Sequence, residues 1–174
     1  MFVGFIAVVV ILLVIVGLMS SGATNGSGGV DQTKATKALS EISALAQSTG
    51  FYKTTTAGSD YAALSTQGLI DAGIVASADI YTVIAGDNVK VDGAQVAVGT
   101  KMVKSKAVTG LFYGAVVNGT AVSKFDLTIA AESDVIAPTS GLGAALEKTY
   151  TKLAGNATVA SGTVTTDGSA VITF

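Results

Sequence analysis

The 174-residue chain contains no cysteine, no histidine, no arginine and no tryptophan. Without cysteine there is no disulfide framework and no thiolate chemistry, and without histidine or cysteine zinc, haem and imidazole catalysis lose their commonest ligands and bases. Because every cation is a lysine, the chain also lacks the guanidinium fork that binds phosphate and guanine in bidentate fashion. A formal net charge of −2 further argues against nucleic acid as a partner. We therefore expect no cofactor, no metal site and no enzyme active site.

Charged residues are also scarce. They make up 13 % of the chain, about half of the roughly 25 % found in ordinary domains, while hydrophobic residues make up 49 %. Such a composition excludes a chain that consists mainly of solvated, disordered segments. The length fits one domain of ordinary size, or one smaller domain with an appendage.

The longest hydrophobic run opens the chain. Residues 1–19 (MFVGFIAVVVILLVIVGLM) carry no charged side chain, and the first ionisable side chain is that of Asp31. As a helix this run would be about 28 Å long, close to the thickness of the hydrocarbon core of a bilayer. A helix that is hydrophobic on every side must be buried in lipid or in protein, because exposing each large side chain costs roughly 1.5–3 kcal/mol. The residues expected to form the buried core of an assembly are Met1, Phe2, Phe5, Ile6, Val9, Leu12, Leu13 and Val16.

Three interpretations of this run compete. A cleavable secretory signal usually has a basic start and an apolar core of roughly 7–15 residues, whereas here no lysine precedes a longer run, although the small residues 20–23 imitate a cleavage site. A simple membrane anchor usually has cationic flanks that fix its orientation, and these are missing too. The third interpretation, which we favour, is an assembly helix that is held in a membrane before use and later packs against copies of itself.

A stretch rich in glycine and serine follows the run. Residues 20–29 (SSGATNGSGG) should not sustain a regular helix, because glycine is the weakest helix former after proline. The stretch is either a flexible linker between an anchor and a domain, or a non-helical joint between two halves of one long helix. The predicted joint glycines are Gly22, Gly26, Gly28 and Gly29. The chain thus divides into an apolar helix with its joint at residues 1–29 and a globular head at residues 30–174.

Residues 30–49 predict an amphipathic helix about 30 Å long. Asp31 lies near its start, where a carboxylate suits the helix dipole, and Gly50 follows its end. Small and apolar residues recur at the i, i+3, i+4, i+7 spacing, at Ala35, Ala38, Leu39, Ile42, Leu45, Ala46 and Thr49. The opposite face, expected to be solvated, carries Lys34, Lys37, Glu41 and Gln47.

The rest of the chain predicts an α+β fold. Short helical turns are expected at residues 59–64 and 66–73, and a further helix from Pro138-Thr139-Ser140 to Gly155. Three hairpins are predicted by the turns Asp92-Gly93-Ala94, Asn118-Gly119-Thr120 and Asp167-Gly168-Ser169, joining residues 89–91 to 95–98, 108–117 to 121–130 and 162–166 to 170–174. The expected architecture is a long N-terminal α-helix, interrupted by the melted Gly/Ser-rich stretch and packed on a mainly antiparallel β-sheet head with short helices.

In its uncharged apolar N-terminus, the helix DQTKATKALSEISALAQS and the segment SDYAALSTQGLIDAGIV, the chain resembles type IV pilins, and among them the type IVb subgroup. The likeness covers residues 1–75, and beyond them only the order of elements agrees. It implies a structural subunit of an extracellular filament. A prepilin peptidase would remove a leader, so that Met1 becomes the mature and commonly N-methylated terminus. Residues 1–19 would then leave the cytoplasmic membrane for the core of a helical homopolymer, built by the pilus assembly machinery.

Two features depart from the pattern of that family. Pilins usually carry a glutamate at position 5 that pairs with the N-terminal amine of a neighbour, whereas this chain has Phe5 and no acid before Asp31. Because a buried, unpaired ammonium is costly, the amine would have to find backbone carbonyls or water, or lose its proton. The C-terminal disulfide is missing as well, so the head would depend on its sheet and on polymer contacts for stability.

The departures keep alternatives open. Archaeal pilins generally do without that glutamate, so an archaeal-type pilin is one alternative. A membrane-anchored pseudopilin or a tethered binding domain of a secretion system is another. Possible glycosylation sites of the form Asn-X-Ser/Thr occur at Asn25, Asn118 and Asn156, although coincidence is the better explanation in a chain so rich in serine and threonine. A basic cluster, either a solvated strand face or a contact to an acidic patch on the next subunit, is predicted from Lys101, Lys104 and Lys106.

Overall fold

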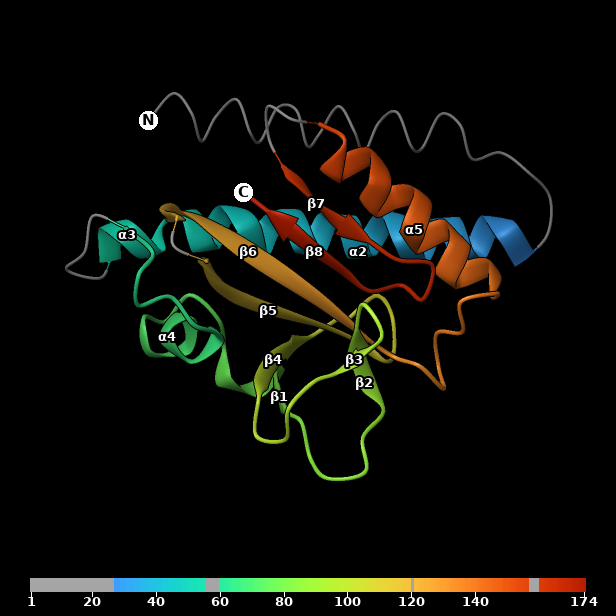
Figure 1. Cartoon of the computed structure of the whole chain (residues 1–174), viewed down its shortest axis with the longest axis horizontal. Coiled ribbons are helices and arrows are strands. Elements are labelled where there is room, and N and C mark those ends of the chain that lie inside the picture. Colours follow the sequence, from blue (N-terminus) through green and yellow to red (C-terminus); the bar gives the residue numbers. More distant parts are fainter. Residues whose placement is uncertain (1–26, 56–59, 120, 157–159) are drawn as a thin grey trace.

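The computed structural model describes residues 27–55, 60–119, 121–156 and 160–174, and within them the fold is α+β, as predicted (Figure 1). The predicted assembly core at residues 1–19, the joint glycines Gly22 and Gly26, and Asn25 lie outside the described residues.

The long helix α2 spans Ser27–Gly50. It begins three residues earlier than the predicted start at Val30, so Gly28 and Gly29, which were predicted to belong to a non-helical joint, lie in its first turn. The predicted apolar face is confirmed: Ala35, Ala38, Leu39 and Ile42 are fully buried, and Leu45, Ala46 and Thr49 are buried as well. Burial of this face holds the helix despite the two glycines in its first turn, since tertiary packing routinely outweighs helix propensity.

Three short helical segments connect α2 to the sheet: α3 (Tyr52–Thr55), α4 (Thr66–Asp71) and the 3-10 turn η1 (Ser77–Asp79). The Ser65 hydroxyl caps α4 by accepting a hydrogen bond from Gly68 N, and Gly73 ends that turn with a φ of 70°. The helical turn predicted at residues 59–64 is wrong in its described part, where Leu64 N donates to Tyr61 O in a turn without a helix.

The sheet of the described residues has eight strands, all antiparallel to their neighbours: β1 (Ile80–Thr82), β2 (Val89–Val91), β3 (Ala94–Gln95), β4 (Lys101–Lys104), β5 (Leu111–Asn118), β6 (Ala121–Glu132), β7 (Ser161–Val164) and β8 (Ala170–Thr173). The order is β1-β4-β5-β6-β2-β3. The second edge of the long strand β6 is shared, because β8 pairs with Asp126–Ile129 and β2 pairs with Ala131 and Glu132. A mainly antiparallel sheet is therefore confirmed.

All three predicted hairpins form, with shifted ends. The β2–β3 turn places Asp92 and Gly93 at φ values of 50° and 74°, a left-handed pair that glycine and aspartate tolerate best. Its second strand ends at Gln95 and does not continue to Val98. The strand predicted from Val108 begins only at Leu111, because the preceding loop bonds to α2.

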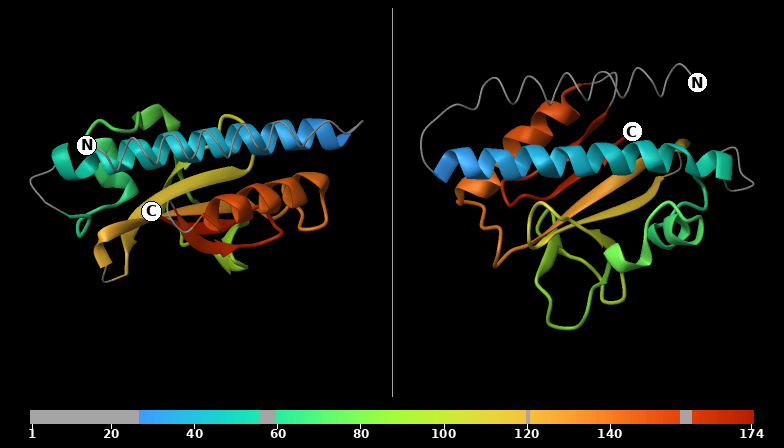
Figure 2. Two further views of the ribbon diagram at one scale, coloured as in Figure 1. Left: turned by 90° about the horizontal axis from the view of Figure 1, so that it is seen from above. Right: turned by 180° about the vertical axis from the view of Figure 1, so that it is seen from behind.

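Two apolar layers cover the two faces of the sheet. On one face α2 and α5 (Gly141–Ala154) lie side by side (Figure 2). Their buried side chains Leu39, Leu146 and Tyr150 belong to one apolar cluster with Tyr113 and Leu127 of the sheet. Ser140 caps α5 by accepting from Gly143 N, as its Pro-Thr-Ser start predicted. The other face carries a smaller cluster of Val89, Met102, Phe112 and Ala130, with Tyr81, Val91 and Val96 packed against it.

Candidate functional site

The outer face of α2 is a regular surface that the other described residues leave exposed. The hydroxyls of Thr33 and Ser40 on this face donate hydrogen bonds to backbone carbonyls of the same helix, at Gly29 O (2.8 Å) and Thr36 O (3.2 Å) respectively. These polar groups are therefore satisfied without a partner. Exposed residues recur at alternating spacings of three and four along this face, and we call them the outer stripe: Val30, Thr33, Lys37, Ser40, Ala44, Gln47 and, just after the helix, Phe51.

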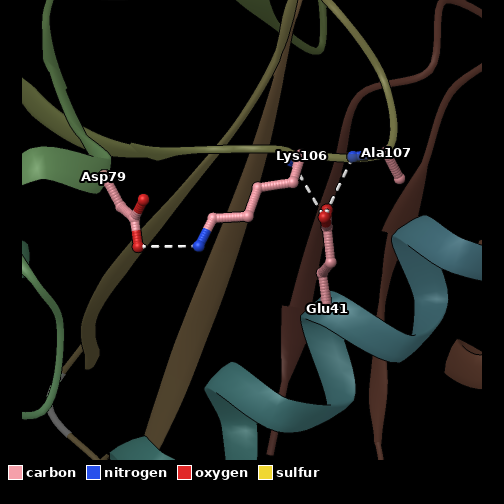
Figure 3. Close-up of polar contacts among 4 residues, drawn as sticks. All are labelled: Glu41, Asp79, Lys106 and Ala107. Atoms are coloured by element: carbon pink, nitrogen blue, oxygen red, sulfur yellow. Dashed lines mark hydrogen bonds and ion pairs between the residues drawn. The ribbon is translucent and has the colours of Figure 1, made fainter.

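The inner side of α2 is fastened by Glu41, which the sequence had placed on the solvated face. One carboxylate oxygen, Oε1, accepts hydrogen bonds from the backbone N–H groups of Lys106 (2.8 Å) and Ala107 (3.0 Å), as Figure 3 shows. The other, Oε2, accepts from the Ser105 hydroxyl at 2.6 Å and the Tyr113 hydroxyl at 2.8 Å. Four donors to one carboxylate hold the loop after β4 against the helix. The solvated position expected for Glu41 is thus wrong.

Two buried tyrosines lie close to this carboxylate. Burial raises the pKa of the Tyr113 hydroxyl well above its usual value, and the nearby Tyr150 and Glu41 raise it further. Burial also raises the pKa of Tyr150 far above its usual value, with the Glu41 charge acting in the same direction. The Tyr150 hydroxyl is buried and has no hydrogen-bond partner among the described residues. Both phenols are therefore kept neutral, and the junction of α2, α5 and the sheet works as a packing site.

A groove of about 440 Å³ lies beside the first turns of α2. Its walls are Gly29, Val30, Thr33, Lys34 and Lys37 of the helix, together with Lys106 and Ala107 of the loop that Glu41 holds. Lys106 Nζ also reaches Asp79 Oδ2 at 3.0 Å (Figure 3). The groove therefore gathers three lysine side chains from two segments far apart in the sequence.

The basic cluster predicted from three lysines near β4 is divided in the structure. Lys101 and Lys104 are exposed at the two ends of β4, and Lys101 donates to the side chain of Gln67. Lys106 instead joins Lys34 and Lys37 at the groove. Sequence reasoning missed this grouping, because the spacing of Lys34 and Lys37 predicts a shared helix face but not the loop that lies against it.

The possible glycosylation asparagines differ in their surroundings. The Asn118 side-chain amide donates to both carboxylate oxygens of Asp126, at 2.8 and 3.0 Å, so its nitrogen is already engaged within the β5–β6 hairpin. Asn156 follows α5, where its backbone carbonyl accepts from Ala160 N at 2.9 Å. Of the two, only Asn156 has a side chain without a hydrogen bond to a described residue.

The described residues offer neither a metal centre nor a membrane-spanning helix. Within residues 27–55, 60–119, 121–156 and 160–174, no group of three or more Asp or Glu side chains is placed to hold a metal ion. None of the helices in that part of the chain is long and apolar enough to cross a membrane.

Comparisons with known proteins found no matching family model, no similar curated protein and no similar solved structure.

Proposed function

We propose that the chain is a structural pilin: a subunit that polymerises through residues 1–19 into an extracellular filament resembling a type IV pilus, used for adhesion, motility or surface attachment. The observation that carries the proposal is the uncharged apolar run, which a short Gly/Ser-rich stretch joins to an amphipathic helix. Such a run must be buried in lipid or protein, and identical helices can bury one another once they leave a membrane.

The arrangement of α2 supports this proposal. Its inner face is buried in the head, whereas the residues of the outer stripe are exposed, and the hydroxyls of Thr33 and Ser40 bond to their own helix. A helix that is fixed on one side and uncovered on the other suits a subunit whose neighbours pack along it. The membrane before assembly, a prepilin peptidase and the pilus assembly machinery are the partners that the resemblance implies. The missing glutamate at position 5 keeps an archaeal-type pilin within the same proposal.

The test is a charge placed inside the apolar run. Replacing Val9 by Lys should abolish filaments while the head still folds, because burying an unpaired ammonium among packed helices costs several kcal/mol. Electron microscopy of material sheared from the cell surface, with circular dichroism of the purified chain, measures both outcomes. Val9→Ile is the matched control and should assemble normally. Normal filaments from Val9→Lys would refute the proposal.

A pseudopilin or a tethered binding domain predicts a different result. In that case the unaltered chain would remain membrane-bound, and sheared surface material would contain no long, uniform fibres. Mass spectrometry of the native N-terminus adds an independent check, since a pilin should begin at a processed and methylated Met1.

A further inference from the structure

The groove beside α2 is a positively charged surface in which only one of the three lysines, Lys106, has a carboxylate partner. All ten lysines and all twelve carboxylates of the chain lie in the described residues. Among those residues the only ion pair joins Lys106 to Asp79, so Lys34 and Lys37 have no carboxylate partner. The acid closest along the helix, Asp31, lies against Gly141 of α5, where a Cβ would meet Asp31 Oδ2 at 2.5 Å, and does not line the groove.

A negatively charged surface lies on the other side of the sheet. Asp87, Glu132 and Asp134 gather around Asn88, whose side-chain amide donates to Asp134 Oδ1 at 2.9 Å and whose carbonyl accepts from Ser133 N at 3.0 Å. The hydrogen bond to Asp87 raises the pKa of the Tyr81 hydroxyl, and the charges of Asp87 and Glu132 act in the same direction. We call Asp87, Glu132 and Asp134 the acidic patch.

Exposed hydrophobic side chains accompany both charged surfaces. Val30, which lines the groove, is 58 % exposed. Ile84 and Val135, which flank the acidic patch in sequence, are 59 % and 48 % exposed. The two surfaces are therefore complementary in charge, and both carry exposed aliphatic side chains. The groove has lysines and one exposed valine, and the acidic patch has carboxylates flanked by two exposed aliphatic side chains.

The two surfaces also have the geometry of a repeating contact. The groove lies at α2, on the face of the sheet that buries Tyr113, whereas Asp87 bonds to Tyr81 on the face that carries Phe112. A contact between two different surfaces of identical subunits is heterologous, and it propagates as a helical array when the rotation between subunits does not close a ring.

We propose that the groove of one head receives the acidic patch of the next head, so that Lys34, Lys37 and Lys106 face Asp87, Glu132 and Asp134 of a second copy of this chain. This inference rests on the proposed function, because it names the contact between neighbouring heads of the filament. Opposite charges would set the register of the heads while hydrophobic packing of residues 1–19 supplies most of the stability. This chain has Phe5 where pilins usually carry a glutamate that pairs with the N-terminal amine of a neighbour, so a second contact that sets the register would replace that pair.

The decisive test is a charge exchange across the contact. Lys37→Glu and Asp134→Lys should each raise the critical concentration for assembly of the full chain about fivefold, since a favourable surface pair becomes a repulsive one. The double variant should return to within about twofold of the unaltered chain. Asp134 is preferred to Asp87, because Asp87 also accepts a hydrogen bond from Ile84 N and its replacement would disturb the loop.

Lys124→Glu is the matched control, because Lys124 is exposed at the start of β6 and borders neither surface. The full chain is purified in detergent and then diluted until the detergent is below its critical micelle concentration. Assembly is measured by sedimentation. Raising the salt from about 0.1 M to about 1 M shortens the screening length from about 10 Å to about 3 Å, and should weaken assembly of the unaltered chain but not of Lys37→Glu.

Each outcome separates the two proposals. If the unaltered chain forms no filaments, the proposed function fails. If it does, but Lys37→Glu behaves like Lys124→Glu or the double variant is not rescued, only the contact proposed here is overturned. Binding of inorganic phosphate to the groove without any change in assembly would likewise overturn it, by showing that the lysines serve a free anion.

Discussion

The two long faces of α2 differ in what holds them. The inner face is fixed by shape and by one carboxylate: Leu39 and Ile42 are fully buried, and Glu41 accepts four hydrogen bonds from the β4–β5 loop and β5. The outer stripe makes no such contact, and its hydroxyls bond back to their own helix. The fold of the head therefore constrains one side of the helix and leaves the other free to serve another contact.

The largest expected effect comes from truncating a buried side chain on the inner face of α2. Leu39→Ala should lower the free energy of unfolding by about 2–5 kcal/mol, because Leu39 is fully buried between helix and sheet and its removal leaves a cavity. Denaturant unfolding of the full chain in detergent, followed by far-UV circular dichroism, measures the loss. A change below 1 kcal/mol would mean that the head does not depend on this face of α2.

A smaller loss is expected where the inner face is polar. Glu41→Gln should lower the free energy of unfolding by about 2 kcal/mol, since the amide keeps one acceptor oxygen but loses the charge and the second acceptor for Ser105 and Tyr113. Glu147→Gln on α5 is the matched control, because the Glu147 side chain has no hydrogen bond to a described residue. Equal stability of the two variants would show that the loop is held by other contacts.

Alkaline pH should act on the same inner junction. Tyr113 and Tyr150 have raised pKa values in the folded head, so the folded state binds their protons more tightly than the unfolded state does. The contribution of the two tyrosines to the free energy of unfolding is fully present below their unfolded-state pKa, near pH 10. Above that pH the free energy of unfolding falls by about 1.4 kcal/mol per pH unit for each tyrosine. Phenolate absorbance and circular dichroism, recorded together, should change together. Ionisation of both residues without unfolding would contradict their burial.

The smallest effect is expected on the outer stripe. Ser40→Ala should change the free energy of unfolding by less than about 0.5 kcal/mol, because Ser40 is exposed and bonds only to its own helix. Beside Leu39→Ala, this substitution compares adjacent residues on opposite faces. Thermal unfolding of the two variants under one set of conditions gives the comparison, and a loss at Ser40 as large as that at Leu39 would remove the distinction between the faces.

Local patterns predicted the buried face of α2, the three hairpin turns and α5, because each depends on spacing or on turn residues within a few positions. The pattern around Glu41 was harder to interpret. It follows Ala38 by three residues and precedes Leu45 by four, so it lies at the edge of the buried face, but only the fold brings Ser105 and Lys106 to it. For the same reason the grouping of Lys106 with Lys34 and Lys37, and the sharing of one β6 edge by β2 and β8, were not predictable from the sequence.

The placement of β8 has a consequence for how the chain is made. Strand β6 receives its last partner only when Ala170–Thr173 arrive, and Phe174 N then donates to Phe125 O at 2.9 Å. Strand β8 is synthesised after the other seven strands of the described sheet, so this part of the β6 edge stays open until β8 emerges. A chain truncated before Ala170 would leave Asp126–Ile129 of β6 without a partner on that edge, where a foreign strand could pair.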